Sequence, residues 1–187
     1  MERTPSLERL RAYAAGSLDA NEQAMVADAI AFMEAHPDCF LRSCLAGHFT
    51  GSSWILNPAR THTVLTLHRK LEKWLNPGGH ADGDPDLLAV ALREAREESG
   101  LRSLRVPSRE LFDFDRHWIP ARPGTPGHWH YDFRFWLEAD STEAVRISSE
   151  SRDLRWVELG QVPILNPGES MARLLRKTGA LPKLYSD

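Results

Sequence analysis

The sequence has only two cysteines and no apolar run long enough to cross a membrane. Cys39 and Cys44 match neither a zinc-binding spacing nor a disulfide framework, so we expect both to be reduced thiols in the core. The amino-terminal segment is charged and amphipathic, whereas a secretory signal needs an apolar stretch. These absences favour a cytoplasmic protein with no membrane partner.

The chain also lacks a large excess of charge of either sign. Its 23 basic and 26 acidic residues give a net charge of −3, and no basic run is present. A nucleic-acid polymer is therefore not an expected partner. A length of 187 residues with 42% hydrophobic content suits one well-packed domain plus an appendage. We predict an N-terminal helical extension over residues 1–46 and the main domain over residues 47–187.

A short helix is predicted between Pro85 and Ser99. Asp84 is placed to cap it, and proline suits the first helical position, where its missing N–H costs nothing. Gly100 suits the left-handed residue that commonly ends a helix. Apolar residues recur at the spacing of one buried helix face: Leu88, Ala91, Leu92 and Ala95.

Three carboxylates lie together on this predicted helix. Glu94, Glu97 and Glu98 stand at i, i+3 and i+4, where like charges cost about 0.2–0.5 kcal/mol per pair in an isolated helix. Arg93 and Arg96 offset part of that repulsion. Two interpretations follow: a solvated helix face, or a site for Mg²⁺, a hard cation that prefers carboxylate oxygen.

The surrounding residues favour the metal site. Residues 79–101 resemble the Nudix box of the Nudix hydrolase family, G-x5-E-x7-R-E-U-x-E-E-x-G-U, where U is aliphatic. Pro85 stands where the family has its first glutamate. The other specified positions match: Gly79, Arg93, Glu94, Ala95, Glu97, Glu98, Gly100 and Leu101.

This resemblance implies an α+β fold, an α/β/α sandwich with a mixed β-sheet, plus the N-terminal helical extension. It also implies a pyrophosphohydrolase that uses Mg²⁺, or Mn²⁺ in its place, to activate water against a diphosphate linkage. The substrate class expected is a small metabolite in which a nucleoside diphosphate is linked to another moiety. By the resemblance, Gly79 joins Glu94, Glu97 and Glu98 as metal ligands, and Arg93 orients the glutamates.

Patterns outside the box agree with a mixed sheet between helical layers. Helices are predicted in the first 35 residues, with a capping box of Asp19 and Glu22, then at residues 40–45 and 170–177. Strands are predicted at residues 54–56 and 64–67 as a hairpin, at 112–118 and 129–137 with strict alternation, and at 154–157. The N-terminal helices suit a lid, a homodimer contact or simple packing.

Further candidate site residues each have two interpretations. Glu150 is a candidate catalytic base or a solvated loop residue. His128, His130 and Asp132 share one strand face, which suits a second metal, phosphate contacts or a plain polar face. His80 follows Gly79 directly, so it either contacts phosphate or caps the loop.

Two residues near the proline- and glycine-rich segment 119–127 are candidates for substrate binding. Trp118 suits stacking on a nucleobase, and Arg116 suits an anionic substrate. Packing in the core is the alternative for the tryptophan, and an ordinary surface position is the alternative for the arginine.

Two other functions remain open for a chain with this box. One is a sensor that binds a nucleotide without hydrolysing it, which the Pro85 departure allows. The other is an isoprenoid diphosphate isomerase, whose chemistry needs an acid–base cysteine near the substrate; Cys39 and Cys44 precede the main domain.

Overall fold

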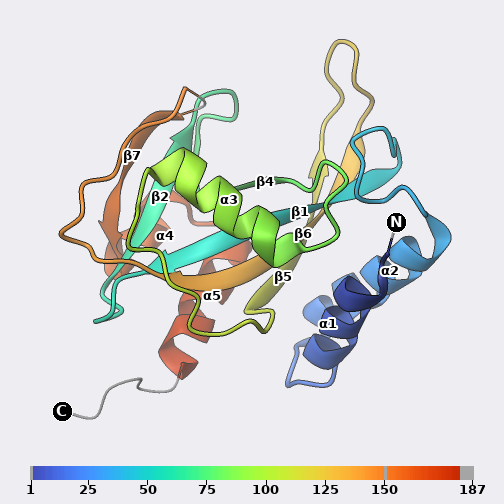
Figure 1. Ribbon diagram of the computed structural model, residues 1–187, viewed down its shortest axis with the longest axis horizontal. Coiled ribbons are helices and arrows are strands. Elements are labelled where there is room, and N and C mark those ends of the chain that lie inside the picture. The colour runs from blue at the N-terminus through green and yellow to red at the C-terminus, as the bar shows by residue number, and fades with distance from the viewer. Residues whose placement is uncertain (1, 150, 182–187) are drawn as a thin grey trace.

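One seven-stranded mixed sheet organises the chain, with helices on both of its faces (Figure 1). The computed structural model describes residues 2–149 and 151–181. The strands are β1 (Gly47–Leu56), β2 (His62–His68), β3 (Lys73–Leu75), β4 (Gly78–His80), β5 (Asp113–Ile119), β6 (His128–Glu138) and β7 (Ser151–Glu158). The helices are α1 (Thr4–Ala14), α2 (Ala20–Ala35), α3 (Leu87–Ser99), the short η1 (Leu159–Gln161) and α4 (Val162–Leu165), and α5 (Glu169–Ala180). Within these ranges no helix is long and apolar enough to cross a membrane. The predicted fold class is confirmed.

The sheet is mixed because β1 and β6 run parallel along their whole shared length. The strand order is β3-β2-β1-β6-β5, and β1 and β2 share a single residue pair, Leu56 with Thr63. Beyond that pair the two strands diverge, so that β4 pairs with β1 and β7 pairs with β2. The predicted hairpin is therefore open. The strands predicted at 112–118 and 129–137 are confirmed as β5 and β6, and the structure shows that they pair antiparallel.

Side chains alternate between the two faces of the sheet. The face that we call the α3 face carries aromatic side chains that pack with α1, α2 and α3; they are Phe49, Phe114, Tyr131, Phe133 and Phe135. The opposite face, which we call the α5 face, buries Trp54, Leu56 and Trp136 against Met171 and Leu174 of α5. Burying side chains of this size contributes about 1.5–3 kcal/mol each.

The N-terminal helices share the core of the sheet. Leu10 of α1 and Met25 and Met33 of α2 lie in the cluster of the α3 face. The predicted capping box is confirmed, since the Asp19 carboxylate accepts from the Glu22 backbone N–H at 2.8 Å.

The short helix predicted at residues 40–45 is wrong, because residues 37–43 and 45–46 form turns. The carbonyl of Cys39 accepts from the backbone N–H of Phe49 at 2.8 Å, which ties this segment to β1 instead of to a helix. Cys39 and Cys44 are buried free thiols, as predicted.

A buried ion-pair network joins β5 to α5. Asp113 of β5 is fully buried and accepts from Arg173 Nε at 2.7 Å, from Lys177 Nζ at 2.8 Å and from Arg134 Nη1 at 3.3 Å. Burial by itself would raise the pKa of this carboxyl group. The hydrogen bond from Arg173 and the three positive charges outweigh burial and hold the pKa below its ordinary value.

Asp113→Asn is expected to lower the free energy of unfolding by about 3 kcal/mol at pH 7, because two buried arginines lose a charged partner. Unfolding by denaturant measures this loss. The difference from wild type is present above the unfolded pKa of about 3.9 and disappears as pH falls through the lower folded pKa. Asp153→Asn, at a half-exposed site 3.9 Å from Arg155, is the control and should change stability by less than about 0.5 kcal/mol. Equal losses in both variants would contradict the role of the network.

Candidate active site

Helix α3 begins later than the sequence suggested. Asp86, not Asp84, is its N-cap, and its carboxylate accepts from the N–H groups of Leu88 and Ala89 at 3.2 and 3.3 Å. Asp84 instead accepts from the Asp86 N–H at 2.9 Å in a local turn, which places Pro85 outside the helix. The end is as predicted, with Gly100 left-handed at φ 69°.

Two glycines allow α3 to lie directly on the backbone of the sheet. A Cβ on Gly51 of β1 would lie 2.5 Å from the carbonyl oxygen of Leu87, and one on Gly79 of β4 would lie 2.3 Å from the carboxyl carbon of Glu94. The contact at Gly51 is with backbone and excludes any side chain there, whereas a side chain at position 79 would force the Glu94 carboxylate to move. Glu94 therefore lies against β4, with only 15% of its side chain exposed.

Arg93 connects the glutamates to β4. Its Nη1 lies 2.6 Å from Oε1 of Glu94 and 3.7 Å from Oε2 of Glu97, and its Nη2 donates to the His80 carbonyl at 3.2 Å. These contacts fix the orientation of the Glu94 carboxylate. Glu97 is exposed, whereas Glu98, one turn beyond Glu94, is half-buried.

A second group of side chains, which we call the imidazole group, lies on the α5 face of the sheet. It consists of His48, His80, His117, His128 and His130. The ring centroid of His48 lies 4.8 Å from the ring centroids of His128 and His130 and 5.0 Å from that of His80. Sequence reasoning missed His48, because no short-range pattern shows that β1 pairs parallel with β6 and brings it opposite His130.

The pKa values of three of these imidazoles, those of His48, His80 and His130, lie below the ordinary value, which favours the neutral ring at pH 7. Burial, followed by the neighbouring imidazole charges, lowers the pKa of His130 to about 2; burial and the charge of Arg42 lower the pKa of His80 to about 4. The pKa of His48 is also lowered, first by burial and then by His128. Among the described residues neither ring nitrogen of His48 makes a hydrogen bond of normal geometry, although the backbone of Cys44 is close enough to offset part of the lowering of its pKa.

The other predicted site residues are divided between the two faces of the sheet. Asp132 is buried on the α5 face and engaged by Thr50, Ser52 and Arg134 at 2.8–2.9 Å. Arg116 and Trp118 lie on the opposite face. There Arg116 pairs with Asp28 at 2.7 Å and covers the ring of Trp129 at 4.4 Å, and Trp118 is 51% exposed. Glu150 lies outside the described residues.

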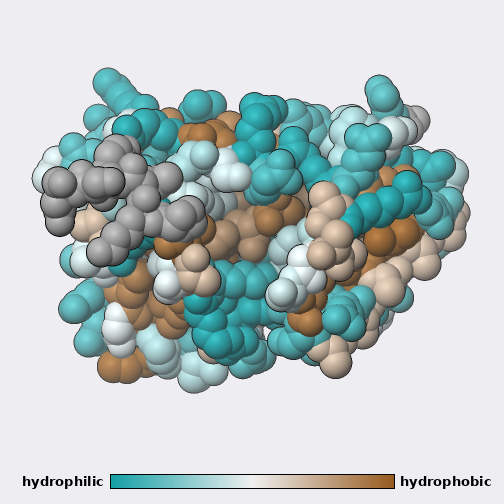
Figure 2. Space-filling model, turned by 90° about the horizontal axis from the view of Figure 1, so that it is seen from below, coloured by the Kyte–Doolittle hydropathy of each residue, from teal (hydrophilic) through white to brown (hydrophobic). Residues whose placement is uncertain are grey.

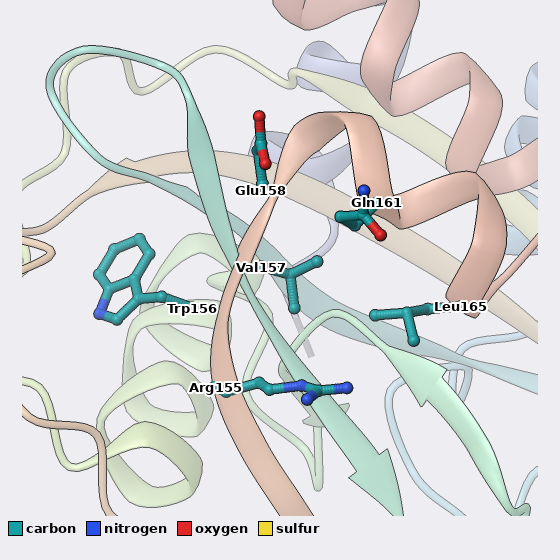
Figure 3. A pocket seen from close by; sticks show the side chains of 6 residues that line it. All are labelled: Arg155, Trp156, Val157, Glu158, Gln161 and Leu165. Atoms are coloured by element: carbon teal, nitrogen blue, oxygen red, sulfur yellow. The ribbon is translucent and has the colours of Figure 1, made fainter.

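A shallow hollow of about 210 Å³ lies elsewhere, beside β7, η1 and α4 (Figure 3). Val157 and Leu165 point toward each other across it, whereas Trp156 points to the other side of β7. None of the predicted site residues lines this hollow. Glu94, between α3 and β4, is therefore separate from this hollow.

Comparisons with known proteins agree with this arrangement. The family model of the NUDIX domain matches residues 50–177. The mouse asymmetrical bis(5'-nucleosyl)-tetraphosphatase is 27% identical over 108 residues, which cover 57% of this chain and 70% of the mouse protein. The pig protein of the same name is 25% identical over 122 residues, 65% of this chain and 80% of the pig protein.

Solved structures show the same fold. A C. elegans Ap4A hydrolase in a binary complex is 20% identical, with a TM-score of 0.57 and coverage of 71% of this chain and 95% of the worm chain. A NUDIX-family hydrolase from Clostridium perfringens is 25% identical, with a TM-score of 0.53 and coverage of 72% of this chain and 98% of the other.

The chain belongs to the Nudix family. It is a Nudix-type pyrophosphohydrolase, an enzyme that acts on phosphoanhydride bonds. Such hydrolases generally use divalent metals, and the residues between α3 and β4 fit one. Three carboxylates on one helix supply hard oxygen donors, and the absent Cβ of Gly79 leaves the β4 backbone open beside Glu94.

Gly79→Ala is expected to reduce turnover by about 100-fold, the loss that a displacement of about 1 Å can cause at a catalytic group. The new methyl group must displace the Glu94 carboxylate. Steady-state kinetics with a dinucleoside polyphosphate and Mg²⁺ measures the effect. Gly160→Ala, where an added Cβ meets nothing within 4 Å, is the matched control and should retain wild-type turnover. Wild-type turnover in Gly79→Ala would show that catalysis does not depend on the contact between the Glu94 carboxylate and the backbone at position 79.

Proposed function

We propose that this chain uses Mg²⁺, with Mn²⁺ as a substitute, to hydrolyse the phosphoanhydride linkage of a nucleoside diphosphate joined to another moiety. A dinucleoside polyphosphate is the first substrate to test, because the mouse, rat and pig relatives are named as bis(5'-nucleosyl)-tetraphosphatases. The observation that carries the proposal is the contact of Glu94 with Gly79 and Arg93, which sets one carboxylate of the box against β4.

In this proposal Glu94, Glu97 and Glu98, with the carbonyl of Gly79, hold the cation. When bound, a divalent cation neutralises phosphate oxygens and lowers the pKa of a bound water. Arg93 keeps Glu94 oriented. A carboxylate of the chain accepts the proton of the attacking water as the new P–O bond forms and the bridging P–O bond breaks. Glu150 is the candidate for this base outside the box; Glu98 is the candidate within it, in which case Glu94 and Glu97 hold the cation.

Residues for substrate binding are also proposed. His80 is the nearest to the box, since its carbonyl already accepts from Arg93. Trp118 offers an exposed ring to a base. The other candidates are Arg116, His130 and Asp132. Because the five candidates for substrate binding are divided between the two faces of the sheet, one small ligand does not contact all of them.

The alternatives have less support. An isomerase needs an ionisable cysteine in reach of its substrate, but Cys39 is buried in the core and burial raises its pKa to about 11. A sensor requires no carboxylate cluster, and here all three glutamates are kept. We also propose that two copies of this chain form a homodimer. Figure 2 shows hydrophobic areas divided by hydrophilic ones on the face seen from below, which singles out no contact surface there.

A substrate panel tests the proposal. Purified protein with Mg²⁺ is expected to release phosphate or a nucleoside phosphate from at least one dinucleoside polyphosphate, nucleotide sugar or nucleoside triphosphate. Ion-exchange chromatography of the products measures this, and a reaction with excess chelator is the control. Tight binding of a panel member without any product would contradict hydrolysis and favour the sensor.

Glu98→Gln is expected to lower kcat by about 10²- to 10⁴-fold, the range typical of general acid–base catalysis, while the melting midpoint stays almost unchanged. Glutamine keeps the size of the side chain and removes its charge. The exposed Glu8→Gln on α1 is the control and should retain wild-type kcat. A Glu98→Gln variant with wild-type kcat would place the base elsewhere, with Glu150 the next to test.

A further inference from the structure

The imidazole group is separate from the carboxylates of the box. His48, His128 and His130 each offer a ring nitrogen, and these three atoms all lie within 4.8 Å of one another. They belong to β1 and β6, whose parallel pairing places the starts of both strands at one end of the sheet (Figure 1). Glu94 contacts the α3 face, whereas the three imidazoles lie on the α5 face.

The structure fixes the tautomer of one of these rings. His128 Nδ1 lies 2.9 Å from the Pro126 carbonyl oxygen, which can only accept a hydrogen bond, so Nδ1 carries the proton. The lone pair is then on Nε2, which lies 3.2 Å from Nε2 of His130. A backbone carbonyl that fixes a histidine tautomer in this way is typical of histidines that bind metals.

His48 supplies an independent observation. This residue is only 4% exposed, and among the described residues neither of its ring nitrogens makes a hydrogen bond of normal geometry. One of its ring nitrogens lies within 4.8 Å of a ring nitrogen of His128 and of His130. Buried polar groups in native proteins are nearly always satisfied, so a buried imidazole of this kind beside two others suits a bound ion.

We propose that His48, His128 and His130 form a second metal site, for a divalent transition metal ion such as Zn²⁺. Three imidazole nitrogens leave one position open in a tetrahedral ion. Two further rings lie beside the three: that of His80 is 5.0 Å from those of His48 and His130, and that of His117 is 5.4 Å from that of His130. Imidazole suits Zn²⁺, Ni²⁺ and Cu²⁺, whereas Mg²⁺ prefers oxygen, so the two sites select different ions.

The two sites meet at β4. Gly79 turns toward Glu94 on one face, and the next residue, His80, turns its ring toward the imidazole group on the other. An ion in the imidazole group would therefore lie on the face of β4 opposite Glu94. The carbonyl group of His80 in this strand accepts a hydrogen bond from Arg93.

Cobalt titration tests the site directly. Full-length protein, stripped with a chelator and dialysed, is titrated with Co²⁺ in the presence of excess Mg²⁺. We expect a visible absorption spectrum typical of tetrahedral Co²⁺ with nitrogen donors, saturating at about one ion per chain, and displacement of that spectrum by Zn²⁺. Elemental analysis after gel filtration counts the bound Zn²⁺. A chain that binds neither ion under these conditions would overturn the proposal.

Variants locate the ion. His48→Asn and His128→Gln are each expected to weaken Co²⁺ binding by more than about 100-fold, beyond the effect of losing a group that only orients a ligand. Circular dichroism verifies their fold, and His128 lies at the start of β6, so that the second variant remains informative if the first does not fold. His36→Gln, in a different group with Asp38 and Cys44, and Glu98→Gln, in the box, are the controls and should bind Co²⁺ like wild type.

The opposite pattern would refute the assignment. Binding lost in His36→Gln or in Glu98→Gln, but kept in His48→Asn and His128→Gln, would place the ion elsewhere. Binding of inorganic phosphate to the stripped wild-type protein that competes with Co²⁺ and is lost in His128→Gln would identify an anion site in place of a metal site. Because none of these measurements uses turnover, the outcome is independent of the proposed hydrolysis.

Discussion

The direct contact of α3 with the backbone of β1 and β4 is the constraint on which the site depends. It exists because Gly51 and Gly79 carry no side chain where Leu87 and Glu94 approach. The contact sets the Glu94 carboxylate against a strand instead of in solvent, and Arg93 closes the arrangement by binding both the carboxylate and the His80 carbonyl. The chemistry of the box thus follows from a packing condition.

The opposite face of the same sheet is polar at its centre. Asp113 and Asp132 on β5 and β6 are buried there among arginines and hydroxyl groups, and the imidazole group continues this face toward the strand ends. Buried charges of this kind are stable only when each has partners, which α5 supplies through Arg173 and Lys177. Lys177 also contacts Glu22 of α2, so one network joins the sheet, α5 and the N-terminal helices.

Local patterns predicted the elements better than their contacts. The alternation that predicted β5 and β6 is a property of consecutive residues, as is the capping box of α2, and both are present. The start of α3 was misplaced because two aspartates compete to cap, and the turn made by Asp84 leaves Asp86 as the N-cap. The predicted hairpin opens because β1 and β2 each pair with another strand, which depends on residues far along the chain.

The sequence alone determined that Glu94, Glu97 and Glu98 share one side of a helix, because helical periodicity is a local property of the chain. It likewise determined the Nudix resemblance. Only the tertiary structure decided which of these carboxylates lies against β4, and only it brought His48 beside His128 and His130. Strand pairing between distant segments places those rings together, and no spacing in the sequence encodes that register.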